Sequence, residues 1–395
     1  MEAPERVELE VLSEVPFPET ANGLVLSPRG EHVVFYRPAL GNVPSLARVD
    51  GRDVRELPNQ GNAGRAAWSP DGDYIAYLST DDHQPGRWME VRVFSVRSGK
   101  VLGAIELEPR DVGPAEGGIV LDDAHPAWSP DGKDLYYLTL AGLYRVDMRD
   151  LRPGGGSRLV PQLVTCADAF PGHMHWLARG PVAWDGQAQL LAFCTSDGAA
   201  QGQVTSGQAV AEDDRSQGVL GTAGDELQPA LWVVDREGGA VVRVPQPGIA
   251  ADGSRGHEVL GWSPDGKKLV WVTAQPVSLP AVAAPQAYRL FVLDLESGRV
   301  SGYLSAGLGD RPVRLQGCSP DGKQVALLVS PGAGEGWELW FLLVSTAGGE
   351  GSERAGAVVP RRWGGEKLME AHWLSPDRLL GLTADYRLLV LKLGQ

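Results

Sequence analysis

Trp128-Ser-Pro-Asp-Gly-Lys133 is the stretch that decides the fold, because the chain repeats it at intervals. The tetrapeptide Ser-Pro-Asp-Gly also begins at Ser69, Ser263 and Ser319, and altered copies begin at Ser27, Asp185 and Ser375. The order Ser, Pro, Asp, Gly fits a type I turn followed by a glycine in the left-handed conformation. Each copy therefore predicts a tight hairpin in which the aspartate bonds to nearby backbone.

Strand signals flank every turn. A short apolar stretch ending in a bulky residue comes before it, and a β-rich run such as Leu135-Tyr-Tyr-Leu-Thr139 comes after it. A third strand follows in each unit, and a second turn signal such as Ser98-Gly-Lys100 leads into a fourth. The near-continuous apolar runs are typical of strands that are buried on both faces, so each unit predicts four antiparallel strands.

The spacing of the turns indicates the architecture. They begin 42, 60, 56, 78, 56 and 56 residues apart, and four-stranded units at periods of about 40–50 residues are typical of β-propeller blades. The last unit has only three strands, while a spare strand at residues 7–13 precedes the first. We therefore expect an all-β, seven-bladed propeller in which that strand completes the last blade, with six or eight blades as alternatives.

The expected propeller is a single domain over residues 1–395. Its blades are expected at residues 16–58, 62–108, 122–165, 180–246, 257–305, 312–360 and 366–395, with strand 7–13 added to the last. Four tryptophans before the turns are interpreted as packing between blades, and an aromatic ligand channel is the alternative: Trp68, Trp128, Trp184 and Trp262.

The repeat resembles that of the TolB-type β-propellers, in which a Trp-Ser-Pro-Asp-Gly-Lys turn precedes an apolar strand. Residues 128–133 and 262–267 match that pattern closely, and the resemblance covers nearly the whole chain as repeats. WD-repeat proteins differ, because no Gly-His and Trp-Asp pairs recur here. The resemblance implies a bacterial, periplasmic propeller, and such folds serve as binding platforms, as enzymes or as gating domains of peptidases.

Composition narrows the classes of partner. The net charge of −14 argues against nucleic acid as a partner. An acidic surface is interpreted as serving solubility, and it would also suit a basic partner or cations. No run of 18 apolar residues exists, so we expect no membrane span. No charged, apolar leader opens the sequence, so we expect either a cytoplasmic protein or an exported one whose signal was trimmed. We expect a monomer with a protein or peptide partner and no cofactor.

The three cysteines indicate neither a metal finger nor a disulfide framework. Cys194 and Cys318 are interpreted as core residues, and Cys166 is expected in a connection. Catalytic motifs are also missing: Gly-x-Ser-x-Gly, a phosphate-binding loop and a dinucleotide fingerprint do not occur.

Loop lengths indicate the working face of the expected ring. The Ser-Pro-Asp-Gly turns emerge on one face, whereas most insertions fall in connections that emerge on the opposite one: residues 80–88, 109–124, 166–180, 196–228 and 274–287. Insertions at residues 149–157 and 346–356 are exceptions on the tight-turn face. Binding residues concentrate in long loops on a rigid scaffold, and residues 196–228 form either a flap or a lid.

Polar and aromatic residues gather in three of these insertions, and His125 directly follows one of them at the opening of the next blade. The whole set consists of Asp82, His83, Asp122, Asp123, His125, Asp168, His173, His175 and Trp176. The two-residue spacing of His173 and His175 aims both rings to one side of an extended segment, so the pair could chelate zinc or copper. The alternative is an aromatic, polar loop that packs over the channel mouth. The paired aspartates are interpreted as solvated loop residues, and binding of Ca²⁺ or of a cationic ligand group is the alternative.

The leading hypothesis is a non-enzymatic propeller that acts as a protein- or peptide-binding platform at the cell envelope. A metal-dependent propeller enzyme, lactonase- or lyase-like with its site at the channel mouth, is the second. A sensor or gating domain of a longer chain is the third. Metal bound at His173 and His175 would separate the second from the first.

Overall fold

The computed structural model describes most strands of the chain and some of its turns. The described residues are 5–17, 21–37, 43–58, 66–81, 88–107, 126–139, 142–149, 151, 157–166, 177–184, 189–196, 230–239, 241–244, 258–262, 267–276, 286–304, 313–321, 323–331, 336–343 and 361–394. This part of the chain contains strands and no helix, so no helix in it is long and apolar enough to cross a bilayer.

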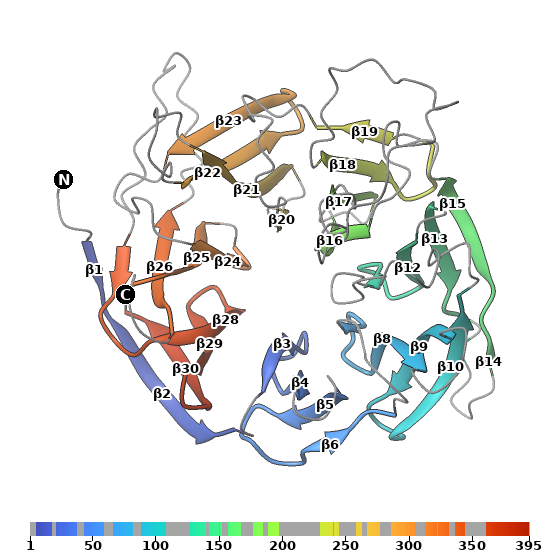
Figure 1. Cartoon of the computed structure of the whole chain (residues 1–395), viewed down its shortest axis with the longest axis horizontal. Coiled ribbons are helices and arrows are strands. Elements are labelled where there is room, and N and C mark those ends of the chain that lie inside the picture. Colours follow the sequence, from blue (N-terminus) through green and yellow to red (C-terminus); the bar gives the residue numbers. More distant parts are fainter. Residues whose placement is uncertain are drawn as a thin grey trace, which may run out of the picture.

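The described strands form seven sheets that follow one another in chain order around a common centre (Figure 1). We number them sheets 1 to 7. The strands of each sheet are given from the centre outward. Sheet 1 consists of β3 (Asn22–Leu26), β4 (His32–Arg37), β5 (Val43–Arg48) and β6 (Arg55–Glu56), and sheet 2 consists of β7 (Ala67–Trp68), β8 (Tyr74–Asp81), β9 (Trp88–Ser95) and β10 (Lys100–Glu106). Sheet 3 consists of β11 (Ala127–Trp128), β12 (Asp134–Thr139), β13 (Gly142–Asp147) and β15 (Pro161–Cys166).

The next three sheets repeat this order. Sheet 4 consists of β16 (Leu177–Trp184), β17 (Leu190–Ser196), β18 (Ala230–Asp235) and β19 (Val241–Arg243), and sheet 5 consists of β20 (Glu258–Trp262), β21 (Lys268–Pro276), β22 (Gln286–Asp294) and β23 (Arg299–Leu304). Sheet 6 consists of β24 (Val313–Cys318), β25 (Gln324–Val329), β26 (Glu338–Leu343) and β27 (Arg361–Trp363).

Sheet 7 joins the two ends of the described chain. It contains β28 (Leu368–Ser375), β29 (Arg378–Thr383), β30 (Arg387–Leu393) and, outermost, β2 (Leu9–Pro16). β2 is antiparallel to β30, with Leu9 opposite Leu393 and Pro16 opposite Arg387. The pairing of an N-terminal strand with the last strand of the chain is the one expected from the sequence, but the bounds differ. The strand was expected at residues 7–13, whereas β2 spans Leu9–Pro16 and Val7 pairs with Trp363 of sheet 6.

Two sheets carry a fifth strand that the four-strand repeat does not predict. β14 (Ser157–Arg158) pairs in parallel with β10, and β1 (Glu5–Val7) pairs in parallel with β27. In both cases the extra strand lies just before the outermost strand of the next sheet, β15 or β2. Each of these segments therefore ties two neighbouring sheets together at the outer rim.

The repeated turns have the predicted chemistry. At the Ser69 turn, Gly72 has a φ of 73° and donates its N–H to the Ser69 carbonyl at 2.8 Å. The Ser69 hydroxyl donates to Asp71 at 2.6 Å, and Asp71 accepts the Asp73 N–H at 3.0 Å. The turns at Ser129 and Ser319 repeat the bonds from the serine hydroxyl and to the aspartate. The copies at Asp185 and Ser263 lie outside the described residues.

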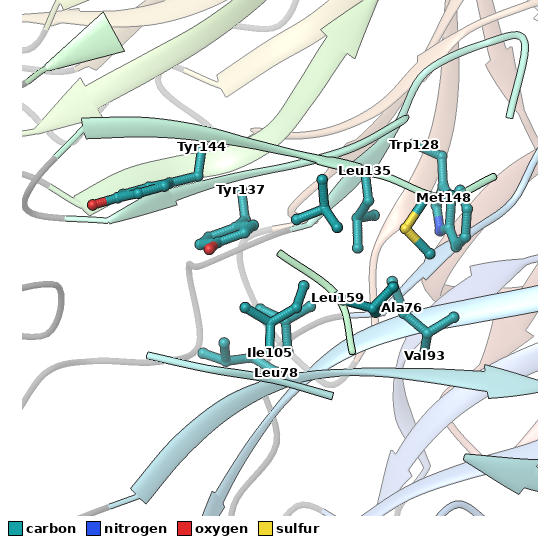
Figure 2. Close-up of a cluster of buried hydrophobic side chains, with 12 residues drawn as sticks. Ala76, Leu78, Val93, Ile105, Trp128, Leu135, Tyr137, Tyr144, Met148 and Leu159 are labelled. Atoms are coloured by element: carbon teal, nitrogen blue, oxygen red, sulfur yellow. The ribbon is translucent and has the colours of Figure 1, made fainter. Parts of the chain in front are cut away.

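The core lies between neighbouring sheets. One cluster joins sheets 2 and 3, where Ile105 and Leu78 face Tyr137 and Tyr144 (Figure 2). The two tyrosine rings stack with centroids 5.4 Å apart. Because each middle strand packs against sheets on both sides, its residues are buried in succession, as in β25, where Val325 to Val329 are all buried. This packing explains the continuous apolar runs in the sequence.

Candidate functional site

The nine residues expected at the binding face all lie outside the described residues: Asp82, His83, Asp122, Asp123, His125, Asp168, His173, His175 and Trp176. The strands on either side of them are described. Asp82 and His83 follow β8, the next three residues lie between β10 and β11, and the remaining four lie between β15 and β16. Their membership of a common site stays a prediction.

The strand order supplies the two faces of the ring. Connections from the second to the third strand and from one sheet to the next leave from the same end of the sheets, which we call the loop face. One boundary differs from expectation: β15 includes Cys166, which pairs with Gly142 and is exposed, and β16 already begins at Leu177. Cys166 therefore ends a strand and does not lie in a connection.

Among the described residues, the most concentrated polar group on the inner strands surrounds Glu370 of β28. Its two carboxylate oxygens accept the backbone N–H groups of Gly23 and Leu24 of β3, at 2.6 and 2.7 Å. His372, two residues further along the same strand, places its Nε2 3.3 Å from the same carboxylate. The carboxylate therefore connects sheet 7 to sheet 1 near the loop-face end of both strands.

The charge of this carboxylate is set by opposing effects. Burial raises the pKa of Glu370, but the hydrogen bonds from His372 and from the two backbone N–H groups outweigh it and lower the pKa below its ordinary value. Glu370 is thus ionised at neutral pH. Its side chain is only 20% exposed, and both oxygens already accept bonds, so the group acts as a fixed anion. The His372 side chain is 29% exposed beside it.

The other side of β28 is bound to sheet 6. Gln316 of β24 accepts the Ala371 N–H at 2.8 Å through its side-chain oxygen. The indole N–H of Trp373 donates to the Gly317 carbonyl at 3.1 Å. The inner strands β24, β28 and β3 belong to three different sheets, and their backbones do not pair with one another. Hydrogen bonds of side chains therefore join these strands.

Tryptophans make the same connection elsewhere in the ring. Trp68 of sheet 2 donates its indole N–H to Val25 of sheet 1 at 2.9 Å, and Trp128 of sheet 3 donates to Ala67 of sheet 2 at 3.2 Å. Packing between sheets is therefore confirmed for Trp68 and Trp128. The Trp184 ring contacts Tyr136 of sheet 3, with centroids 5.0 Å apart, and the Trp262 side chain lies outside the described residues.

In sheet 7, Leu374 directly precedes the turn copy at Ser375, in the sequence position that these tryptophans occupy before their turns. A register shift between Trp373 and Ser375 moves the strand by one residue, so that Trp373 takes the role of the donor. The sequence gives no sign of this bulge, because the turn copy that follows it begins at the expected residue, Ser375.

The turn aspartates also reach beyond their own hairpins. Arg236, in the turn after β18 of sheet 4, pairs with Asp131 at 3.2 Å and with Asp134. Although burial raises the pKa of Asp131, bonds from the Ser129 hydroxyl, Arg236 and the Lys133 N–H lower it below its ordinary value. A purely local role was expected for Asp131, and the structure adds a junction between sheets 3 and 4.

The pair of Glu370 and His372 was not predicted from the sequence, although the pattern of polar residues in this strand indicates it. Glu370 and His372 are the polar positions in Leu368-Met-Glu-Ala-His-Trp-Leu374, and residues two apart on a strand point to the same side. The Glu370 carboxylate accepts bonds from β3, some 346 residues away, and this contact depends on closure of the ring. Among the described residues, no group of three or more His, Cys, Asp or Glu is placed to hold a metal ion.

No protein-family model matches the chain, and no curated protein sequence does. Solved structures are similar to it. The Cps50 (Swd1) β-propeller domain of Myceliophteria thermophila has a TM-score of 0.58 at 12% identity, covering 98% of this chain and 100% of that one. Hydrazine synthase of Kuenenia stuttgartiensis has a TM-score of 0.59 at 13% identity, covering 95% and 97%. At these identities the likeness concerns the fold, and it shows an all-β chain with a β-propeller fold.

Proposed function

We propose that this chain is a TolB-like, seven-bladed β-propeller whose loop face binds a protein or peptide at the cell envelope. The observation that carries the proposal is the contrast between its two faces. The described first-to-second turns are tight and hydrogen-bonded, whereas the longest connections leave the loop face of the ring. Side-chain hydrogen bonds tie the inner strands of sheets 6, 7, 1, 2 and 3 together. A rigid scaffold with long loops on one face suits recognition of a protein surface.

The seven-blade count is supported by the seven sheets of the described residues and by the pairing of β2 with β30. The seven blades expected above, from residues 16–58 to 366–395 with strand 7–13, are part of the proposal. Their ends are moved where described strands run past them, at β2, β15, β16 and β27. The partner would contact the loops that hold Asp82, Asp122, His125 and His173. An acidic protein of net charge −14 suits a basic partner surface.

Deletion of a loop tests the proposed binding face. Residues 197–228 are replaced by a short Gly-Ser linker, and a tagged protein is used to recover partners from the cell extract. We expect at least one partner to be lost. The matched control replaces residues 345–356 on the opposite face, which should retain every partner. Unchanged recovery with the first deletion, or loss with both, would count against the loop face.

The metal-dependent alternative makes a separate prediction, because the spacing of His173 and His175 would suit zinc or copper. On the platform proposal, purified protein should hold well below one equivalent of metal, and the His173→Ala, His175→Ala double variant should hold the same amount. Elemental analysis measures this directly. Stoichiometric metal that disappears in the double variant would favour an enzyme at this face.

A further inference from the structure

Exposed apolar side chains of the described chain collect at its outer rim. Among these residues, five large hydrophobic side chains are exposed: Val11 (47%), Leu12 (41%), Val54 (38%), Val160 (62%) and Leu163 (51%). Each lies on an outermost strand or directly before one, namely β2, β6 and β15. An apolar residue at an open sheet edge is unusual for a soluble surface, since such edges can pair with other chains.

β2 has the largest open edge of the ring. It has eight residues, whereas the other outermost strands of the described chain have two to seven. β14 pairs with Gly103 and Ala104 in the second half of the seven-residue strand β10, and β1 pairs with all three residues of β27. No described strand pairs with the outer side of β2, which runs along the outside of sheet 7 (Figure 1).

The backbone of β2 offers hydrogen bonds on that outer side. Gly394 donates its N–H to the Glu8 carbonyl, whereas the Leu393 N–H donates to the carbonyl of Asp377, the residue directly before β29, on the opposite side of β30. Because the two sides of an antiparallel strand alternate, Leu9 and Val11 direct their N–H and C=O groups away from β30. Another extended chain could accept and donate bonds there.

A bulge shapes the side chains of this edge. The register shifts between Val11 and Ser13, so Leu12 is an extra residue with no partner in β30. Two consecutive apolar residues are consequently exposed, where a regular strand would bury one of them. Together they form an apolar patch in the middle of the open edge.

Charge around the patch specifies what can pair with it. Glu8 and Glu10 are exposed and have no ion-pair partner among the described residues, whereas Glu14 is paired with Arg387 at 2.5 Å. Two copies of this edge would bring like charges together, and like charges opposite each other destabilise a strand pair. A strand with lysine or arginine beside its apolar residues would place opposite charges there.

The molecule itself uses strand addition at this rim. β1 and β14 each pair in parallel with the outermost strand of a neighbouring sheet, through three and two residues respectively. We propose that the outer edge of β2 binds a basic, partly apolar segment of a protein partner by addition of a β-strand. This site is separate from the loop face and rests on the proposed function only in assigning a protein partner.

A synthetic peptide tests the proposal on the whole chain. The probe is fluorescein-labelled Lys-Val-Lys-Thr-Lys-Val-Lys-Thr, and its binding is followed by fluorescence polarisation. We expect saturable binding that is weakened about tenfold or more by Val11→Ser with Leu12→Ser, which removes the apolar side chains without adding charge. The matched control is Val160→Ser with Leu163→Ser, which makes the same change at the edge of β15 and should leave binding unchanged. If the first variant fails to fold, Glu10→Lys alone provides the test.

Two further arms separate strand addition from charge attraction. The same peptide with alternate N-methylated residues keeps its side chains and charge but loses backbone donors, so it should bind about tenfold more weakly. Equal binding of the methylated peptide, or equal loss in both double variants, would overturn the proposal. A concentration-dependent dimer abolished by the Val11 and Leu12 changes would assign the edge to a second copy and would overturn it too.

The replacement of residues 197–228 distinguishes this inference from the loop-face proposal. The peptide should bind that variant as it binds the intact chain. Conversely, the Val11→Ser, Leu12→Ser variant should still recover the loop-face partner from extract. Loss of binding at the loop face therefore leaves the test of the β2 edge interpretable, and loss of binding at the β2 edge leaves the test of the loop face interpretable.

Discussion

Single polar side chains join the inner strands of neighbouring sheets in this ring. Glu370 accepts two backbone N–H groups of sheet 1, and the indoles of Trp68 and Trp128 each donate to a carbonyl of the preceding sheet. Inner strands of adjacent sheets do not share a backbone ladder, so their polar groups would otherwise lack these partners. The junctions are therefore sensitive to changes of one functional group.

Replacing Glu370 with Gln should lower the free energy of unfolding by about 1–3 kcal/mol at neutral pH. A Gln keeps one oxygen and directs an NH₂ group at the second backbone N–H, so one of the two bonds from Gly23 and Leu24 is lost. Denaturant unfolding of both proteins measures the difference. Glu56→Gln is the control, because the Glu56 side chain is 56% exposed and should change stability little.

The effect of Glu370→Gln should also depend on pH. The pKa of Glu370 is lowered in the folded state from an ordinary value of 4.5, so its charge contributes stability that is complete above that value. This contribution is lost as the pH falls through the lower, folded-state pKa. The gap in stability between the two proteins should thus persist at about pH 6 and shrink toward about pH 3. A gap that widens with acid would contradict this assignment.

The tryptophans allow a comparison within one chain. Trp68→Phe removes the indole bond to Val25, whereas Trp184→Phe removes an indole N–H that is buried with no hydrogen-bond partner among the described residues. We expect the first change to lower stability by about 1 kcal/mol more than the second, since only it leaves a carbonyl without its donor. Equal losses in thermal unfolding would show that ring packing alone matters.

At the scale of elements, turn chemistry could be predicted from sequence and register could not. The Ser-Pro-Asp-Gly turns form the predicted bonds, because Ser, Asp and Gly act locally. The same bonding recurs at Thr383, whose hydroxyl donates to Asp385 while Tyr386 adopts a φ of 58°. A tyrosine in the left-handed region gives no sequence signal, and neither does the bulge at Trp373.

The third-to-fourth-strand turns provide a prediction about neighbouring sheets. Gly238 of sheet 4 has a φ of 77°, and a β-carbon there would collide with the Val164 carbonyl of β15. Gly298 of sheet 5 has a φ of 65°, with no atom within 4 Å of such a carbon. Gly298→Ala should therefore lower stability by about 1 kcal/mol and Gly238→Ala by about 1–3 kcal/mol more. Similar losses in chemical unfolding would refute the close approach.

For the whole molecule, repeats predict the fold better than the site. Periodic turns and apolar runs act within one unit, so they indicate the sheets and their order. The expected site residues, such as His173 and His175, lie in connections that the repeat does not govern and that fall outside the described residues. The Glu370 junction and the edge of β2 arise from contacts between distant segments, which periodicity does not reveal.

Removal of residues 1–16 tests the closure of the ring. It deletes β1 and β2 and leaves the outer sides of β27 and β30 without partners. We expect a large loss of thermal stability and association of the exposed edges, measured by thermal unfolding and size-exclusion chromatography. Removal of residues 1–4, which precede both strands, is the control and should leave both measurements unchanged. A stable, monomeric 17–395 chain would contradict closure through β2.

The pairing of Leu9 with Leu393 has a consequence for biosynthesis. A ribosome releases β2 long before β30 exists, so the N-terminal strand must stay unpaired while almost the entire polypeptide is translated. During that interval Val11 and Leu12 are available to chaperones and to other nascent chains, and contacts of such large sequence separation form slowly. The acidic residues Glu8, Glu10 and Glu14 oppose such association in the nascent chain. Like charges on the unpaired β2 segments of different chains repel each other until β30 is available to close the ring.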